Sequence, residues 1–267
     1  MVGRRVTQKV LAYILKQVQK AGDELDRYQP TEIDWRARAN ATCRRLVPWL
    51  SENANDLCKY VDGVMNSPSD VRRAANELLR SISEHPDFAA AAKIQRTVAL
   101  LKRSLDSEEL LISNAGGTVV SKLIERYLIE ASTNWSLDSN GASDYPDLFI
   151  QDADYSRLPR FVKKSDQTYG AALKGKQRRP VRVPDGLEIK TCKGSFAVDC
   201  HHAHTGLHLV LLFEKTRARF ATRDVQIGFM RHELYRITKP ASPTTTLKAS
   251  FNGDHFVSLL DRDDTSP

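Results

Sequence analysis

The chain has 267 residues, 41% of them apolar, and a net charge of +7. This apolar fraction is enough to bury a core in one large domain or two modest ones, so the composition indicates a globular protein. The sequence has no run of eighteen apolar residues, and its first twenty residues lack the apolar stretch and the cleavage site of a secretory signal. We therefore expect a cytoplasmic protein without a membrane partner.

The four cysteines are Cys43, Cys58, Cys192 and Cys200, and no two of them form a C-x-x-C pair. Cysteines this sparse do not make a disulfide framework in a chain of this length. We expect reduced thiols with a structural role.

The first part of the chain has the apolar spacing of helices. Apolar residues between Val6 and Val18 recur at helical spacing and predict a first helix with lysines on its opposite face. A second helical region covers residues 33–65. Pro48 lies inside it and predicts an interruption, because proline removes a hydrogen-bond donor and clashes with the preceding turn.

Three further helices are expected. One starts at Pro68, behind Ser67 as a capping residue. The others cover residues 86–105 and 118–132. All of the predicted helices except the one at residues 118–132 lie within residues 1–110, which we therefore interpret as an all-helical region.

Short β-favouring runs separated by Pro, Gly and Asn follow the last helix. They cover residues 147–151, 186–192, 207–215, 224–230 and 255–260. The order of one helix and then successive strands predicts an α/β core of mixed type. We place this core at residues 111–267, behind the helical region 1–110.

Two of the predicted strands contain charged residues that are costly to bury without a partner. Asp147 starts the first strand, directly after Pro146, and Glu188 and Lys190 lie in the second. Side chains two residues apart share one face of a strand, so Glu188 and Lys190 are a geometric pair. If the two strands are neighbours, the carboxylates of Asp147 and Glu188 converge beside an ammonium group. Two carboxylates next to a phosphate are a typical site for magnesium.

The basic character of the protein is local. Residues 156–182 hold nine basic residues and one acid, Asp166, so the rest of the chain sums to about −1. A charge run of this kind is either a solvated loop or an element that contacts phosphates. Its position between the two acidic strands favours the second interpretation.

The pair Pro146-Asp147, followed about forty residues later by Glu188-Ile189-Lys190, resembles the PD-(D/E)XK nuclease superfamily, and most of all its type II restriction endonucleases. The resemblance covers roughly residues 115–215. It implies a restriction-endonuclease-like core with a central mixed β-sheet flanked by helices. Asp147, Glu188 and the backbone carbonyl of Ile189 would bind Mg²⁺, and Lys190 would orient or activate the attacking water.

The activity that this resemblance implies is magnesium-dependent hydrolysis of double-stranded DNA at a short specific sequence. A water attacks the phosphorus in line with the leaving 3′ oxygen and leaves a 5′ phosphate. Enzymes that cut both strands usually present two active sites, so a homodimer is implied, with residues 1–110 as dimerisation region or DNA-embracing arm. No nucleotide cofactor is expected. The alternatives are a repair or junction-resolving nuclease, and a non-catalytic DNA-binding protein.

Further residues are candidates for the site or for DNA contact. The family often has an acid on the preceding helix, which makes Glu125 the possible extra acid, although the helical wheel places it off the buried stripe and predicts a solvated side chain. Asp185 belongs to a second Pro-Asp pair and is expected in a turn; Glu214 is expected outside the site. The expected DNA contacts are Lys163, Lys164, Lys174, Lys176, Arg178, Arg179, Arg182, Lys193, His201, His202 and His204.

The cluster of one cysteine and four histidines between Cys200 and His208 also suggests zinc. Its spacing matches neither the paired ligands of structural zinc fingers nor the H-E-x-x-H helix. We therefore interpret one or two of these histidines as DNA contacts and the others as packing or surface residues.

Overall fold

The computed structural model describes residues 2–21, 35–83, 114–132, 136–139, 146–151, 171–174, 177–180, 186–200, 205–216, 219–238 and 248–260. Its long helices are α1 (Val2–Lys20), α3 (Trp35–Met65), α4 (Pro68–Ser83) and α6 (Asn114–Ala131). They agree with the predicted helices, and α4 starts at the expected proline. The helix predicted over residues 86–105 lies outside the described residues. No helix in the described part of the chain is long and apolar enough to cross a membrane.

The predicted interruption at Pro48 is wrong, because α3 runs through this residue without a break. A proline inside a helix costs about 3 kcal/mol. On both sides of it, however, Leu46, Val47 and Leu50 are at most 1% exposed. Burying side chains of this size contributes about 1.5–3 kcal/mol each, which outweighs the local penalty.

Three sheets follow the helices in the described ranges. The largest is six-stranded, in the order β1-β2-β5-β7-β8-β11; a second has the order β6-β10-β9, and the third is the pair β3-β4. The strands are β1 (Ser136–Ser139), β2 (Leu148–Gln151), β3 (Ala171–Lys174), β4 (Gln177–Pro180), β5 (Gly186–Lys193), β6 (Ala197–Cys200), β7 (Gly206–Lys215), β8 (Phe220–Met230), β9 (Arg236–Thr238), β10 (Lys248–Asn252) and β11 (Val257–Ser258). Two short 3-10 helices, η2 (His232–Leu234) and η3 (Gly253–His255), connect the last strands.

The large sheet is mixed, as expected. Strands β1, β2 and β5 are antiparallel neighbours, β5 and β7 run parallel, and β8 returns antiparallel to β7. The structure therefore shows a mixed α/β protein with helices in its N-terminal region. The predicted strands correspond to β2, β5, β7, β8 and β11. The sequence pattern missed the four-residue strands β1, β3, β4 and β6 and the strands β9 and β10.

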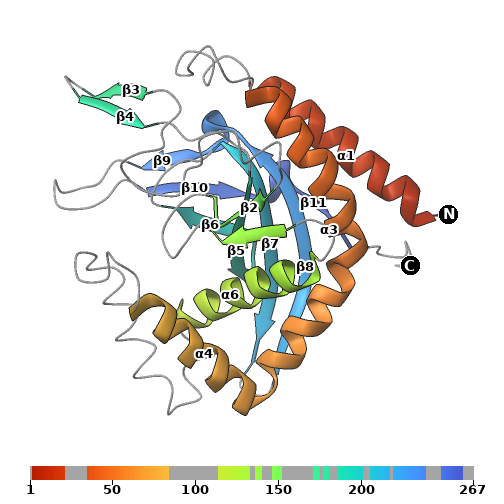
Figure 1. Cartoon of the computed structure of the whole chain (residues 1–267), viewed down its shortest axis with the longest axis vertical. Coiled ribbons are helices and arrows are strands. Elements are labelled where there is room, and N and C mark those ends of the chain that lie inside the picture. Colours follow the sequence, from red (N-terminus) through yellow and green to blue (C-terminus); the bar gives the residue numbers. More distant parts are fainter. Residues whose placement is uncertain are drawn as a thin grey trace.

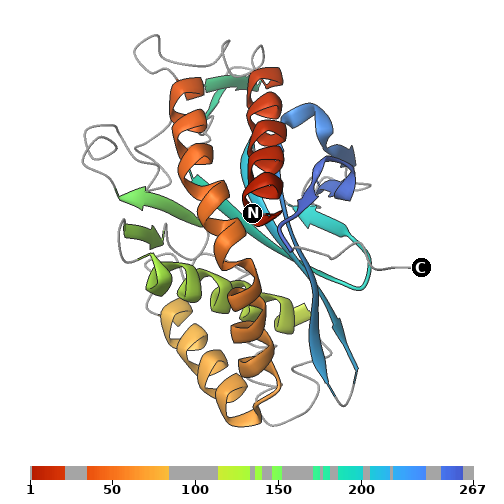
Figure 2. The ribbon, with the colours of Figure 1, turned by 90° about the vertical axis from the view of Figure 1, so that its right-hand side faces the viewer.

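The large sheet lies between two layers (Figures 1 and 2). One face carries Leu187, Ile189, Leu209 and Leu211, which share a core with the buried faces of the long helices. The other face carries Cys192, Val210 and Leu212, which pack with residues of the sheet β6-β10-β9. Because α1 and α3 share the core of the large sheet, the described helices of the N-terminal region are part of the same packed body. Its expected role as an arm or dimer interface stays a prediction.

The end of α3 is joined to β8 by side-chain hydrogen bonds. Asn66, directly after the helix, donates to the carbonyl of Phe220 and accepts from its N–H, both at 2.8 Å. Asp62 accepts from the backbone N–H of Thr222 at 2.8 Å and from its hydroxyl at 2.7 Å. These bonds satisfy backbone groups at the start of β8 and fix the helical layer on the sheet.

Part of the basic segment forms a β-hairpin. Strands β3 and β4 pair antiparallel, with Leu173 opposite Arg178 and Lys174 opposite Gln177. In Figure 1 this hairpin lies apart from the two larger sheets.

Candidate active site

Asp147 lies where β2 and β5 come together. The two strands pair at Leu148 with Leu187 and at Phe149 with Gly186. Extending this register by one residue places Asp147 opposite Glu188. The carboxylate oxygen Oδ2 of Asp147 accepts a hydrogen bond of 2.7 Å from the backbone N–H of Ile189. The Asp147 side chain thus bonds to the backbone of β5 just beyond the end of the β2–β5 pairing. This hydrogen bond holds the side chain against β5.

Glu188 and Lys190 form an ion pair on β5, as their spacing predicts. Glu188 is 5% exposed, and its oxygen Oε1 accepts from the Lys190 ammonium. Within the described part of the chain, the other oxygen, Oε2, is shielded from solvent and has no hydrogen-bond partner. An unpartnered buried carboxylate oxygen is costly, and it is the kind of atom that a bound cation satisfies.

The charges of these residues act on one another. Burial and then the negative charge of Asp147 raise the pKa of Glu188 to about 7, against the opposing effect of the Lys190 ammonium. Burial by itself lowers the pKa of Lys190, but the carboxylates of Glu188 and Asp147 outweigh it and raise that pKa above its usual value. Lys190 is therefore protonated at neutral pH.

Glu125 belongs to the same electrostatic cluster, and the expectation that it is solvated is wrong. It is 5% exposed on α6. The pKa of Glu125 is raised to about 7, and burial is the main cause. The charge of Asp147 also raises this pKa, whereas the ammonium groups of Lys122 and Lys190 lower it. The physical reason for its burial is that α6 contacts β5, β1, α3 and α4, so more than one face of the helix is covered. Glu125 is thus a buried acid on α6 whose charge interacts with those of Asp147 and Lys190.

The acidic residues fit a hard divalent cation in part. Asp147 and Glu188 supply oxygen ligands, which Mg²⁺ prefers, and Glu188 has a free oxygen to offer. In the described ranges, however, no three acidic, histidine or cysteine side chains are gathered closely enough to hold a metal ion. A site with two carboxylates completed by water and substrate phosphate remains compatible with this geometry.

Four of the eleven predicted DNA contacts lie in the described part of the chain. Lys174, Arg178 and Arg179 are in the strands of the β3–β4 hairpin. Lys193 is exposed at the end of β5. The remaining ones lie outside the described residues: Lys163, Lys164, Lys176, Arg182, His201, His202 and His204. Asp185 also lies outside them. For Ile189 the structure shows the N–H contact to Asp147, whereas the metal-binding role of its carbonyl stays a prediction.

The described residues of the cysteine and histidine cluster are core residues. His208 is fully buried on β7, in register with Glu188 on β5. Its Nδ1 lies 2.9 Å from the carbonyl of Gly206, and its Nε2 lies 3.1 Å from the hydroxyl of Tyr235. Cys200 is buried, and burial raises the pKa of its thiol to about 11. All four cysteines are free thiols, as expected.

Glu214 lies outside the site. Its carboxylate is exposed and pairs with Arg223 at 2.8 Å. This agrees with the expectation from the sequence.

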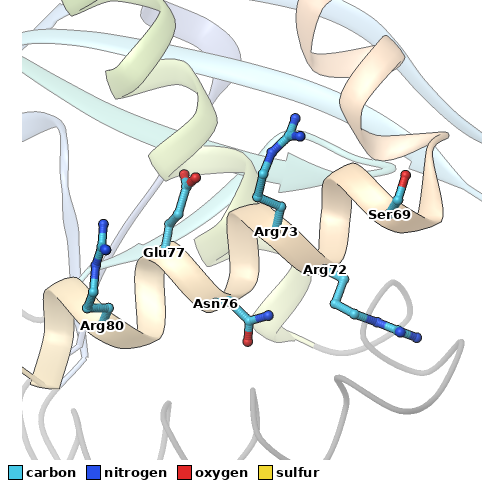
Figure 3. A pocket seen from close by; sticks show the side chains of 6 residues that line it. All are labelled: Ser69, Arg72, Arg73, Asn76, Glu77 and Arg80. Carbon is cyan, nitrogen blue, oxygen red and sulfur yellow. The ribbon is translucent and has the colours of Figure 1, made fainter.

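A pocket of about 470 Å³ lies along α4 and contains none of the predicted site residues. Its described lining residues are Ser69, Arg72, Arg73, Asn76, Glu77 and Arg80. Figure 3 shows that Arg73, Glu77 and Arg80 point to one side of the helix, whereas Arg72 and Asn76 point to the other. These side chains do not converge on a common point, so the acidic cluster is the better candidate for an active site.

Comparisons with known proteins do not place the chain in a family. No family model, curated protein or solved structure matches it significantly. The functional argument therefore depends on the residues and geometry of the site.

Proposed function

We propose that this protein is a magnesium-dependent endonuclease of restriction type that hydrolyses double-stranded DNA at a specific sequence. The observation that supports the proposal most directly is the meeting of both halves of the motif on neighbouring strands. Asp147 bonds to the strand that bears Glu188 and Lys190, and Glu188 keeps one buried oxygen without a partner among the described residues. A buried carboxylate oxygen without a hydrogen-bond partner is costly, and such atoms are typical of functional sites.

Each residue has a role in this proposal. Asp147 and Glu188 would hold the magnesium ion, which would supply Lewis-acid stabilisation of the phosphate. Lys190 keeps its proton because two carboxylates raise its pKa, so it is a charge stabiliser rather than a base. Its ammonium would stabilise the negative charge that develops on the phosphoryl oxygens while a water attacks. The β3–β4 hairpin would contact DNA phosphates.

A cleavage assay distinguishes this function from its alternatives. The purified protein is incubated with mixed plasmid and phage DNA, with magnesium or with a chelator. Discrete magnesium-dependent fragments support a restriction-type enzyme. Structure-dependent nicking indicates a repair or junction-resolving nuclease instead. Intact DNA together with a band shift indicates a non-catalytic DNA-binding protein.

The Asp147→Asn variant tests the site itself. The amide oxygen can still accept from the Ile189 N–H, so the shape is kept while one ligand charge is removed. In magnesium, cleavage should fall at least ~10²-fold. In chelator, DNA binding should stay equal or become tighter, because one charge that repels phosphate has gone. Asp185→Asn, at the other Pro-Asp pair, is the matched control; if it abolishes cleavage and Asp147→Asn does not, the site is wrong.

A further inference from the structure

Lys215, the last residue of β7, has a shielded ammonium group. Its Nζ is buried from solvent and has no hydrogen-bond partner within the described residues. An ammonium carries three donors, and withdrawing them from water without a partner costs free energy. A bound anion removes this cost. Lys215 is therefore a position at which the protein gains from an anionic ligand.

A second cation lies on the same face of the large sheet. Lys193 on β5 is in register with Phe213 on β7, and the N–H of Gly194 donates to the carbonyl of Phe213 at 2.9 Å. Lys215 is two residues beyond Phe213, and side chains alternate between faces along a strand, so both lysines share the face of Phe213. At the usual strand spacing and rise, their Cα atoms lie roughly 8 Å apart. Lysine side chains are long enough to bring both ammonium groups to one ligand.

The lysine pair lacks a counter-charge among the described residues around it. Burial and then the positive charge of Lys193 lower the pKa of Lys215 to about 8, so Lys215 is still mostly charged at pH 7. Glu214 alternates to the opposite face and pairs with Arg223 at 2.8 Å. Asp62, near the end of α3, already accepts two hydrogen bonds from β8. The two ammonium groups thus repel each other while these acids are engaged elsewhere.

The lysine pair is separate from the candidate active site. Lys193 shares its face of β5 with Ile189, which packs against the helices, whereas Glu188 and Lys190 lie on the other face. Lys193 is also three residues beyond Lys190, which is about 10 Å along the strand. A ligand of the lysine pair therefore does not have to be the substrate of the acidic cluster.

The chemistry of the pair fits a phosphate. Two ammonium groups offer six donors to a tetrahedral oxyanion. A phosphate monoester carries about −1.5 to −2 charges near pH 7, which matches two ammonium charges, whereas a carboxylate neutralises one of them. Arg219 is exposed in the turn that follows β7, where its N–H donates to Oγ1 of Thr216 at 3.2 Å, and it adds positive charge to this end of the sheet.

We propose that Lys193 and Lys215 bind a phosphate group at this end of the sheet. The phosphate belongs either to a small phosphorylated molecule or to the DNA backbone, and the experiment below distinguishes these sources. The inference goes beyond the proposed function and does not depend on it, because the site lies on the other face of β5.

The test measures stabilisation by inorganic phosphate in the absence of DNA and magnesium. Urea unfolding of the full-length protein is compared in phosphate and in chloride of equal ionic strength. With phosphate at about ten times its Kd, the unfolding equilibrium constant of the parent protein should fall about tenfold. Lys215→Met should lose this shift, and Lys215→Arg, which keeps the charge, should retain it. Phosphate also stabilises proteins in general, so the readout is the difference between parent and variant.

Lys215→Met has a second readout with the opposite sign. In chloride this variant should be more stable than the parent protein, because it removes a shielded ammonium without a partner in the described structure and keeps most of the side-chain volume. A lysine with only a packing role would give equal or lower stability. Lys59→Met is the matched control: Lys59 is an exposed lysine that pairs with Asp56 at 2.9 Å, and its replacement should not change the phosphate response.

A DNA-binding measurement identifies the source of the phosphate. If Lys215→Met weakens binding to every DNA sequence and makes the salt slope shallower by about 0.9, the ligand is a backbone phosphate. If DNA binding is unchanged while the phosphate response is lost, the ligand is a small phosphorylated molecule. Lys193→Met, at an exposed position, should also lose the phosphate response, and it replaces Lys215→Met if that variant does not fold. The inference is wrong if phosphate stabilises the folded variants as much as it stabilises the parent protein.

Discussion

Lys190 is the residue of the candidate site that we expect to stabilise charge during cleavage. It lies on β5, pairs with Glu188, and keeps its charge because the carboxylates of Glu188 and Asp147 raise its pKa. Such a group stabilises developing negative charge without reorganisation, because the protein already holds it in place. Its removal should therefore affect the chemical step rather than DNA binding.

We expect Lys190→Ala to reduce cleavage at least ~10²-fold, the scale of losing one preorganised stabilising group. DNA binding measured in calcium should stay within a few fold of the parent value. Lys193→Ala is the control on the same strand: this exposed lysine is a predicted phosphate contact, so its removal should weaken binding and reduce the salt dependence. Near-normal turnover of Lys190→Ala would contradict the assigned role.

His208 makes stability depend on pH. Burial lowers its pKa to about 3, and the hydrogen bond to Gly206 offsets this only in part. Because the folded pKa is below the unfolded value of about 6.5, the unfolded chain binds more protons between these values. The contribution of His208 to stability is therefore complete above pH 6.5 and is lost as the pH falls towards 3. The raised pKa values of Glu125 and Glu188 act in the opposite direction.

Urea unfolding at pH 7 and pH 5 isolates this effect when the parent protein is compared with His208→Gln. The parent protein should lose about 2 kcal/mol more between the two pH values than the variant does, since one pKa unit corresponds to about 1.4 kcal/mol. Both proteins contain the glutamates, so the comparison cancels most of their contribution. An equal loss in both proteins would show that His208 is not the responsible group.

Among the secondary-structure elements, the contact between β2 and β5 depends on a glycine. A Cβ atom on Gly186 would lie 2.3 Å from the carbonyl oxygen of Leu148 and 2.3 Å from Cγ of Pro146. These residues flank Asp147. A side chain at this position would push β2 away from β5 and carry the Asp147 carboxylate with it.

We expect Gly186→Ala to lower the free energy of unfolding by about 1–3 kcal/mol, the usual cost of overpacking. Cleavage should fall with it, because Asp147 would be displaced. Gly63→Ala provides the contrast, since a Cβ there meets nothing within 4 Å. Within α3 that change should stabilise the protein by about 0.5–1 kcal/mol and leave cleavage unaffected. Urea unfolding and the plasmid assay measure both effects.

Across the molecule as a whole, the positive charge is concentrated in the part of the sequence between β2 and β5. The net charge is +7, and the segment 156–182 accounts for +8. The part of this segment that the structure describes is the β3–β4 hairpin, which lies apart from the larger sheets (Figure 1). Phosphate contacts from such a segment should appear as salt-dependent binding that is the same for all DNA sequences.

Replacing Lys176, Arg178 and Arg179 together with Ala should weaken binding to every DNA sequence. The slope of log affinity against log salt should become shallower by about 0.9 for each phosphate that the variant no longer neutralises. Replacing Arg72, Arg73 and Arg80 of α4 with Ala removes the same charge at another place and should leave the slope unchanged. An unchanged slope in the hairpin variant would show that the segment is a solvated loop. Weaker binding to one sequence alone would show that the segment contacts bases.

Local periodicity was enough to predict part of this fold. Apolar spacing identified the long helices that the structure describes and the strands β2, β5, β7 and β8. The strand period of two also predicted that Glu188 and Lys190 share a face, and they form an ion pair. These features were predictable from the sequence because a helix or a strand brings residues together at fixed short separations.

Contacts between distant parts of the chain decided the other features, and these appeared only in the folded structure. Pro48 stays within α3 because the core buries its neighbours, and Glu125 is buried because several elements cover α6. The hydrogen bond from Ile189 to Asp147 joins residues that are 42 positions apart. No local pattern records such contacts, since burial and pairing depend on what the rest of the chain places against each residue.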